Sequence, residues 1–265
     1  MVNSFAELLI GPLFGNFWAA FNGTLLHLSM TGNLVFILLL TVMVGLTIYK
    51  HKLTVVGAIT GALVAIAIFA GTGFPGIILL ATFFIAATFA TSWQFDFKVQ
   101  LGLSEKNHGR RDSFQVLANG GIAGLLGLAA ITFSEYRHVL TIMIACSLSA
   151  ATADTISSEL GSLYGKKFLN IMTFRPDKRG ENGVVSLEGF AFGILGSSLI
   201  ALAYGLTEEF SWSTILIIVI AGTVGNLVDS VLGATLERNG KIKNNGVNFL
   251  NTFSASIFAL ISLLL

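Results

Sequence analysis

The chain is built from apolar stretches that are each long enough to cross a lipid bilayer. A transmembrane helix needs about 20 mostly apolar residues, with a range of roughly 17 to 25. Charged residues make up only 11% of the sequence, whereas a soluble domain carries about 25%. The sequence therefore predicts an all-α, polytopic integral membrane protein with about nine transmembrane helices, near residues 4–21, 33–49, 53–71, 74–92, 114–133, 138–156, 187–206, 212–233 and 247–265.

The same apolar segments determine the expected domain organisation. Two soluble domains would fit a chain of 265 residues, but the succession of apolar segments argues against them. We expect one transmembrane domain over residues 1–265, with N-terminal spans in 1–92 and a motif-bearing catalytic core in 93–265. Two glycines, a proline and an asparagine interrupt the first segment, 4–21, so a surface or re-entrant helix is the alternative there.

Charge and cysteine content exclude several classes of protein. Fifteen basic and 14 acidic residues give a net charge of +1, so the chain lacks the basic field of a nucleic-acid-binding protein and we expect no such partner. The single cysteine, Cys146, lies inside an apolar run. A single cysteine excludes an intrachain disulfide and a cysteine-based metal cluster.

The distribution of lysine and arginine predicts which loops face the cytoplasm. If the nine spans alternate, one side of the membrane receives all 15 basic residues except Arg137. Loops rich in these residues stay in the cytoplasm. We therefore expect any active site built from the polar loops to be cytoplasmic; they carry Lys50, Lys52, Lys98, Lys106, Arg110, Arg111, Lys166, Lys167, Arg175, Lys178, Arg179, Arg238, Lys241 and Lys243.

The segment before the fifth predicted span continues its polar character into the membrane. Asp112, Gln115 and Asn119 are spaced at i, i+3 and i+7, which puts them on one face of a helix. Arg110 and Arg111 precede them and are candidates for binding phosphate. The alternative is that both arginines anchor the helix at lipid headgroups, although this leaves Gln115 and Asn119 unexplained.

The end of the sixth predicted span carries carboxylates inside the membrane. An ionisable residue in a span is costly and by default indicates function. Asp154 shares a helical face with Ser157, Ser158 and Gly161, whereas Glu159, five residues later, points about 140° away. Glu159 joins Asp154 only if the helix loosens; a structural ion pair with a neighbouring helix is the alternative for these carboxylates.

The loop that follows the sixth predicted span contributes polar groups to the same side of the membrane. It carries Lys166, Lys178, Asn182, Gly183 and Ser186, where basic side chains suit phosphate oxygens and glycine permits close approach of the backbone. A flexible basic loop without a ligand is the alternative.

The last two spans complete the set. Asp229 lies on one face of the eighth span with Asn226, and Asn248 opens the ninth. Small residues on that face would also suit tight helix packing, but an aspartate and several asparagines near one leaflet indicate a hydrated pocket.

These residues suit magnesium-assisted phosphoryl transfer. Mg²⁺ takes oxygen ligands, typically one or two carboxylates completed by phosphates and water, and phosphoryl transfer needs chiefly positioning and charge neutralisation. We predict catalytic roles for Asp112, Asp154 and Asp229, and Mg²⁺ binding by Asp154, Glu159 and Asp229. The candidates for binding nucleotide and phosphate are Arg110, Arg111, Asn119, Lys166, Lys178, Asn182, Gly183, Ser186 and Asn248.

Five motifs together resemble the phytyl-phosphate kinase family. They are GRRDSFQVLANG (109–120), ADTISSELG (153–161), GVVSLEG (183–189), GNLVDSVLGA (225–234) and NGVN (245–248). Members of that family are membrane enzymes that convert isoprenyl monophosphates to diphosphates. The resemblance implies a kinase acting on phytyl, farnesyl or geranylgeranyl phosphate.

A more distant likeness concerns the nucleotide. The layout of 153–167, 188–189 and 225–243 is similar to the membrane CDP-diacylglycerol synthases, and dolichol kinase is related in chemistry. This likeness implies CTP as the donor, with Mg²⁺, and it makes a CDP-lipid-forming cytidylyltransferase the main alternative. A membrane transporter is a third interpretation, since intramembrane carboxylates suit it, and a homodimer is left open.

Overall fold

The computed structural model describes residues 30–103, 109–208 and 210–265. Eight helices in these ranges are long and apolar enough to cross a membrane, which confirms the all-α polytopic class. The segment 4–21 lies outside the described residues. The eight helices are α2 (Met30–Tyr49), α3 (Val55–Thr72), α4 (Phe74–Ser92), α6 (Ser113–Thr132), α7 (Arg137–Tyr164), α8 (Leu187–Thr207), α9 (Trp212–Leu232) and α10 (Asn244–Leu264).

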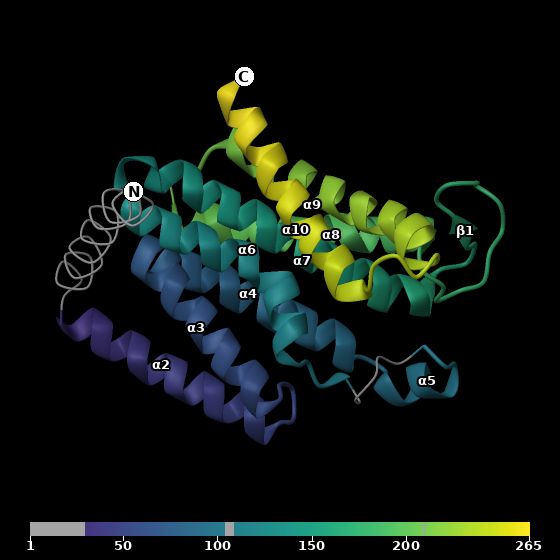
Figure 1. Cartoon of the computed structure of the whole chain (residues 1–265), viewed down its shortest axis with the longest axis horizontal. Coiled ribbons are helices and arrows are strands. Elements are labelled where there is room, and N and C mark those ends of the chain that lie inside the picture. Colours follow the sequence, from purple (N-terminus) through teal and green to yellow (C-terminus); the bar gives the residue numbers. More distant parts are fainter. Residues whose placement is uncertain (1–29, 104–108, 209) are drawn as a thin grey trace, which may run out of the picture.

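Short elements join the long helices. The described residues add α5 (Phe95–Gln100), the 3₁₀ turn η2 (Ser134–Tyr136), the π-helical turn η3 (Gly233–Glu237) that continues α9, and the strands β1 (Leu169–Asn170) and β2 (Val184–Val185). The two strands pair antiparallel, Leu169 opposite Val185. Figure 1 shows α5, this hairpin and the turn after α9 gathered toward one end of the bundle.

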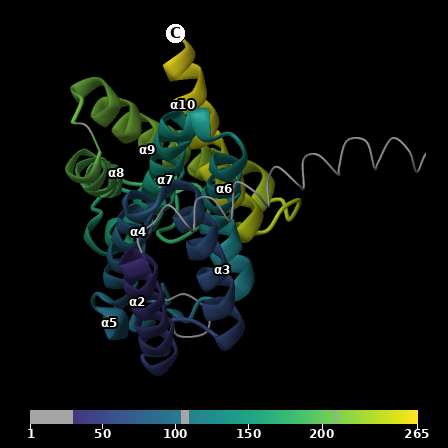
Figure 2. The ribbon, with the colours of Figure 1, turned by 90° about the vertical axis from the view of Figure 1, so that its left-hand side faces the viewer.

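Helix α7 lies at the centre of the bundle. It contacts α4, α6, α8, α9 and α10, which surround it in Figure 2. In the most apolar 18-residue stretch of Ser134–Tyr164, which contains α7, 83% of the residues are buried, against 11% in the corresponding stretch of α2. Its inner part is rich in alanine, serine and threonine, and small residues let membrane helices approach closely where lipid supplies no hydrophobic driving force. The sequence of α7 thus explains its central position.

Glycines lie at two close helix crossings. A Cβ atom at Gly127 of α6 would come within 2.7 Å of the Ile68 Cα atom of α3. A Cβ atom at Gly161 of α7 would likewise collide with Gly189 of α8, 2.5 Å from its Cα atom. Only glycine allows these two backbone contacts.

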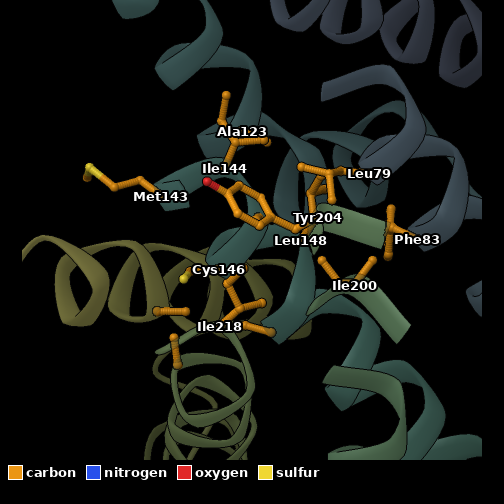
Figure 3. Packing of buried hydrophobic residues seen from close by; sticks show 14 of the residues in the cluster. Leu79, Phe83, Ala123, Met143, Ile144, Cys146, Leu148, Ile200, Tyr204 and Ile218 are labelled. Atoms are coloured by element: carbon orange, nitrogen blue, oxygen red, sulfur yellow. The ribbon is translucent and has the colours of Figure 1, made fainter. Parts of the chain in front are cut away.

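The apolar core surrounds the N-terminal half of α7. Tyr204 of α8 lies among Leu79 of α4 and Ile144 and Leu148 of α7, as Figure 3 shows. Cys146 is fully buried in the same cluster. Ser147 and Ser149 are buried in this half too, but both carboxylates of α7, Asp154 and Glu159, lie in its other half.

A buried ion pair fixes the short helix α5 to the bundle. Lys98 of α5 pairs with Glu159 of α7, and the two side chains are 1% and 9% exposed. The Lys98 ammonium also donates to the carbonyl oxygens of Ala90 and Thr91 at the end of α4, at 2.7 and 3.3 Å. The ammonium therefore joins three helices.

We expect the Lys98–Glu159 pair to be needed for the stability of the folded protein. Lys98→Met leaves the Glu159 carboxylate buried and uncompensated, which costs about 3–5 kcal/mol and should lower the thermal unfolding midpoint in detergent. Lys178→Met is the matched control, because Lys178 is 82% exposed in its pair with Glu181. The double variant Lys98→Met/Glu159→Gln should recover part of the loss; an unchanged midpoint in Lys98→Met would contradict the structural role.

Candidate active site

A polar cavity of about 1100 Å³ opens between the helix ends that the sequence predicts to face the cytoplasm. Its walls come from α6, α7, α8, α9, η3 and α10, and the hairpin segment 180–186 forms another side. Segments far apart in the sequence therefore meet at one place. From the predicted site, the structure brings together Arg111, Asn119, Asp154, Asn182, Gly183, Ser186, Asp229 and Asn248.

Two carboxyl groups that line this cavity lie close together. The side chains of Asp154 on α7 and Asp229 on α9 are within hydrogen-bonding reach of one another. Two carboxylates at that separation repel unless a proton or a cation lies between them. The pair therefore either shares a proton or holds a cation.

Amide side chains also line the cavity. Asn248 of α10, oriented with its amide nitrogen toward α9, donates to Asp229 Oδ2 at 3.3 Å. Asn119 of α6 donates to the Gln115 carbonyl oxygen at 3.0 Å, while its own Oδ1 is buried without a hydrogen-bond partner among the described residues. A buried oxygen without a partner costs free energy, so a ligand or water at Asn119 would be stabilised.

The hairpin closes one side of the cavity through contacts with η3. Gly183 has a φ of +74°, and a Cβ atom there would collide with Ala234. The Asn182 side chain lies within hydrogen-bonding reach of the Glu237 carboxylate. Single π-helical turns occur frequently at functional sites, and η3 here presents Gly233 and Glu237 to the cavity.

An ion pair outside the cavity fastens the hairpin. Arg238 Nη1 donates to Asp177 Oδ2 at 2.7 Å. Asp177 also accepts from the Asn170 side chain at 3.2 Å and from the backbone N–H of Lys178 at 2.7 Å. The Arg238 hydrogen bond, with these two, holds the pKa of Asp177 below its usual range.

The charge balance of the cavity is acidic. Among the described residues that line it, Asp154, Glu181, Asp229 and Glu237 carry carboxyl groups, and Arg111 is the one basic residue. A polyphosphate would be repelled by such walls unless cations accompanied it. The described residues contain no group of three or more histidine, cysteine, aspartate or glutamate side chains placed to hold a metal, so two carboxylates are the protein's acidic contribution at one point.

The structure corrects the predicted roles of two carboxylates. Asp112 is the N-cap of α6. Its Oδ1 accepts from the Gln115 backbone N–H at 2.9 Å, and the Asp112 backbone N–H donates to Gln115 Oε1 at 3.0 Å. Asp112 therefore stabilises a helix end instead of reaching the cavity. Glu159 turns away from Asp154 and pairs with Lys98, because α7 stays helical through this region.

Three of the predicted phosphate-binding residues also lie elsewhere. Arg110 donates through Nε to the Leu53 carbonyl oxygen at 3.1 Å. Lys178 is exposed and pairs with Glu181 at 3.6 Å. Lys166 does not line the cavity; its backbone N–H donates to a Glu188 carboxylate oxygen at 3.3 Å. The sequence placed these residues on the correct end of the bundle, but only Arg111 of the predicted basic set lines the cavity.

Sequence reasoning missed Lys98 as a partner for the intramembrane carboxylates. Its signal was its place in the largely apolar segment 95–101, where a single lysine either reaches a headgroup or needs a buried partner. Glu237 was also missed as a cavity residue. Nothing in the sequence marks the π-helical turn that presents it.

The comparisons with known proteins cover most of the chain. The model of the integral membrane protein family DUF92 matches residues 37–256. The chain belongs to this family. It is 29% identical over 195 residues to protein VTE6, chloroplastic, of Arabidopsis thaliana, a match that covers 71% of this chain and 59% of VTE6. The chain thus spans little more than half the length of that relative.

Two other relatives extend the DUF92 comparison. Protein PGR of Arabidopsis thaliana is 29% identical over 276 residues, covering 86% of this chain and 96% of PGR. An uncharacterized membrane protein of Methanocaldococcus jannaschii is 34% identical, covering 71% of this chain and 76% of its own. These matches confirm, at the level of the family, the resemblance that the motifs indicated. No solved structure matches the chain.

We expect the hairpin of this DUF92 protein to loosen at acid pH. A carboxyl group whose pKa is lowered on folding contributes stability above its usual pKa of about 4 and loses that contribution as pH falls through the lowered value. The protection of residues 169–185 against hydrogen exchange, taken relative to the intrinsic exchange rate at each pH, should therefore fall below about pH 4. At pH 7, Arg238→Gln should speed up the same exchange. Arg175→Gln, which removes an exposed arginine of the same hairpin, should not; equal effects of the two variants would contradict the role of Arg238.

Proposed function

We propose that the protein is a membrane isoprenyl-phosphate kinase that uses CTP and Mg²⁺. Its substrate is a lipid monophosphate such as phytyl, farnesyl or geranylgeranyl phosphate, and its product is the corresponding diphosphate. Family membership shared with VTE6 supports the proposal, as do the motifs that resemble phytyl-phosphate kinases. The observation that carries it is the Asp154–Asp229 carboxyl pair at the base of a polar cavity within a membrane bundle.

The residues of the cavity fit Mg²⁺. Asp154 and Asp229 supply two carboxylates, and the neighbouring amide oxygens, including the unpartnered Oδ1 of Asn119, supply neutral oxygen donors. Mg²⁺ typically binds through one or two carboxylates together with substrate phosphates. When bound, the ion would neutralise the negative charge of the phosphates, which the acidic walls of the cavity cannot do.

The chain's own residues bind and orient the two substrates. We assign Arg111 to a phosphate, since a guanidinium can donate two parallel hydrogen bonds to it, and the backbone around Gly183 to the nucleotide. An oxygen of the lipid phosphate attacks the γ-phosphorus, the bond from that phosphorus to the β–γ bridging oxygen breaks, and CDP leaves with its electron pair. A lipid phosphate is already ionised near neutral pH, so no side chain needs to act as its base.

The rival chemistry uses the same residues but a different phosphorus atom. Attack on the α-phosphorus would release pyrophosphate and form a CDP-lipid. Incubating the purified protein with geranylgeranyl phosphate, CTP and Mg²⁺ and identifying both products by mass therefore decides between them. CDP with a lipid diphosphate supports the kinase; pyrophosphate with a nucleotide-lipid supports the cytidylyltransferase.

The carboxyl pair should be indispensable for turnover. Asp154→Asn or Asp229→Asn removes one of two charges at the proposed ion, and we expect kcat to fall about a hundredfold or more, equal to about 2.7 kcal/mol. The thermal unfolding midpoint should change little, because asparagine has nearly the same shape. Asp96→Asn on α5 is the matched control, since Asp96 is exposed and outside the cavity. Undiminished turnover in either cavity variant would refute the assignment.

A soluble nucleotide requires the cavity to face the cytoplasm. In a Cys146→Ala background, cysteines at Glu181 and Lys241, both exposed, should react with a membrane-impermeant thiol reagent only from the cytoplasmic face. A cysteine at Glu208, between α8 and α9, should react only from the opposite face. Labelling of Glu181 and Lys241 from opposite faces would separate two walls of the proposed site.

A further inference from the structure

A second cavity, apolar and about 960 Å³ in volume, lies beside the polar one. Helices α2, α3, α4 and α6 form its walls, with side chains such as Met43, Val64, Leu80 and Phe84. Its lining therefore suits an apolar ligand.

The apolar cavity meets the polar cavity at three shared residues. Arg111, Gln115 and Asn119 line both. Arg111 lies at the start of α6 and places its guanidinium carbon 5.9 Å from the ring centre of Phe83 on α4. The junction therefore joins a charged, hydrogen-bonding end to an apolar interior, as a ligand with an anionic head and a hydrocarbon tail requires.

We propose that the apolar cavity holds the isoprenyl chain of the lipid monophosphate while its phosphate lies at the Arg111 junction. This inference rests on the proposed function, because it assigns the tail of that substrate. It gives the N-terminal spans α2–α4 a role in substrate selection, although the motifs that resemble kinases begin after them.

The length of the cavity indicates a long chain. On α2 the cavity lining begins at Thr47. The Thr47 carbonyl oxygen accepts from the Lys52 N–H, and the Lys52 carbonyl oxygen accepts from the Arg111 N–H, so Thr47 marks the junction end of the lining. The lining reaches Phe36 on the same helix, and eleven residues from Thr47 to Phe36 correspond to about 17 Å of helix, so a short isoprenyl chain would leave the far end unfilled.

Filling the cavity should change which chain length the enzyme prefers. Ala81 of α4 lines the cavity on the tail side of Phe83, the residue that Arg111 contacts, so Ala81→Phe places a ring inside the cavity. We expect the KM for geranylgeranyl phosphate to rise about tenfold, equal to about 1.4 kcal/mol, while the KM for geranyl phosphate is unchanged. Ala62→Leu on α3 fills the cavity from another wall and serves if Ala81→Phe does not fold.

The matched control adds the same ring outside the cavity. Ile85 of α4 is 62% exposed on the outer surface of the bundle and does not line the cavity, so Ile85→Phe should leave both KM values unchanged. A uniform loss of activity with every chain length in Ala81→Phe, or an equal change in the control, would overturn the tail assignment while leaving the kinase proposal intact.

A binding measurement separates this inference from the proposed function. Geranylgeranyl monophosphate carrying a diazirine at its far end should cross-link to α3, α4 or α6, and unlabelled geranylgeranyl monophosphate should compete. Ala81→Phe should reduce that cross-linking. If the wild-type protein turned over no lipid phosphate, the kinase proposal would fail and this measurement would still test the cavity. Cross-links on the outer surfaces of α8 and α9, or a lack of competition, would overturn it.

Discussion

The arrangement of the bundle depends on polar groups that α7 carries into the membrane. An unpaired charge in the hydrocarbon region is costly, so each carboxylate of α7 needs its own partner. Glu159 pairs with Lys98 on α5, whereas Asp154 lies beside Asp229 on α9, an arrangement that requires a shared proton or a bound cation. One side of α7 is thereby committed to stability and the adjacent side to the cavity, which explains why the most buried helix also carries the proposed chemistry.

Close packing is what makes this arrangement sterically accessible. Alanine, serine and glycine along α7 let five long helices approach it, so the ends of α9 and α10 reach the same cavity as α6. Gly161 and Gly189 allow α7 and α8 to meet backbone to backbone, which brings the start of α8 and its capping Ser186 to the wall of the polar cavity. Helix packing and site geometry are therefore consequences of the same small residues.

The two cavities are lined by different sets of helices. Helices α6 to α10 surround the acidic, hydrogen-bonding cavity, whereas α2, α3 and α4 join α6 around the apolar one. The start of α6 borders both, because Arg111 just before the helix and Gln115 and Asn119 within it line the two cavities, while Asp112 caps the first turn. An amphiphilic lipid substrate would therefore be recognised by the whole bundle and not by the motif-bearing part alone.

The sequence by itself determined the helices, since apolar stretches of bilayer length have few alternatives, and it identified Asp154, Asp229 and Asn248 because polar groups inside a span are costly. It also located the basic loops at one end. Only the tertiary structure decided which polar groups converge, because side-chain direction depends on where neighbouring helices pack. It assigned Asp112 to a helix cap and Glu159 to Lys98, left Arg110, Lys166 and Lys178 outside the cavity, and opened an apolar cavity whose walls come from four separate helices.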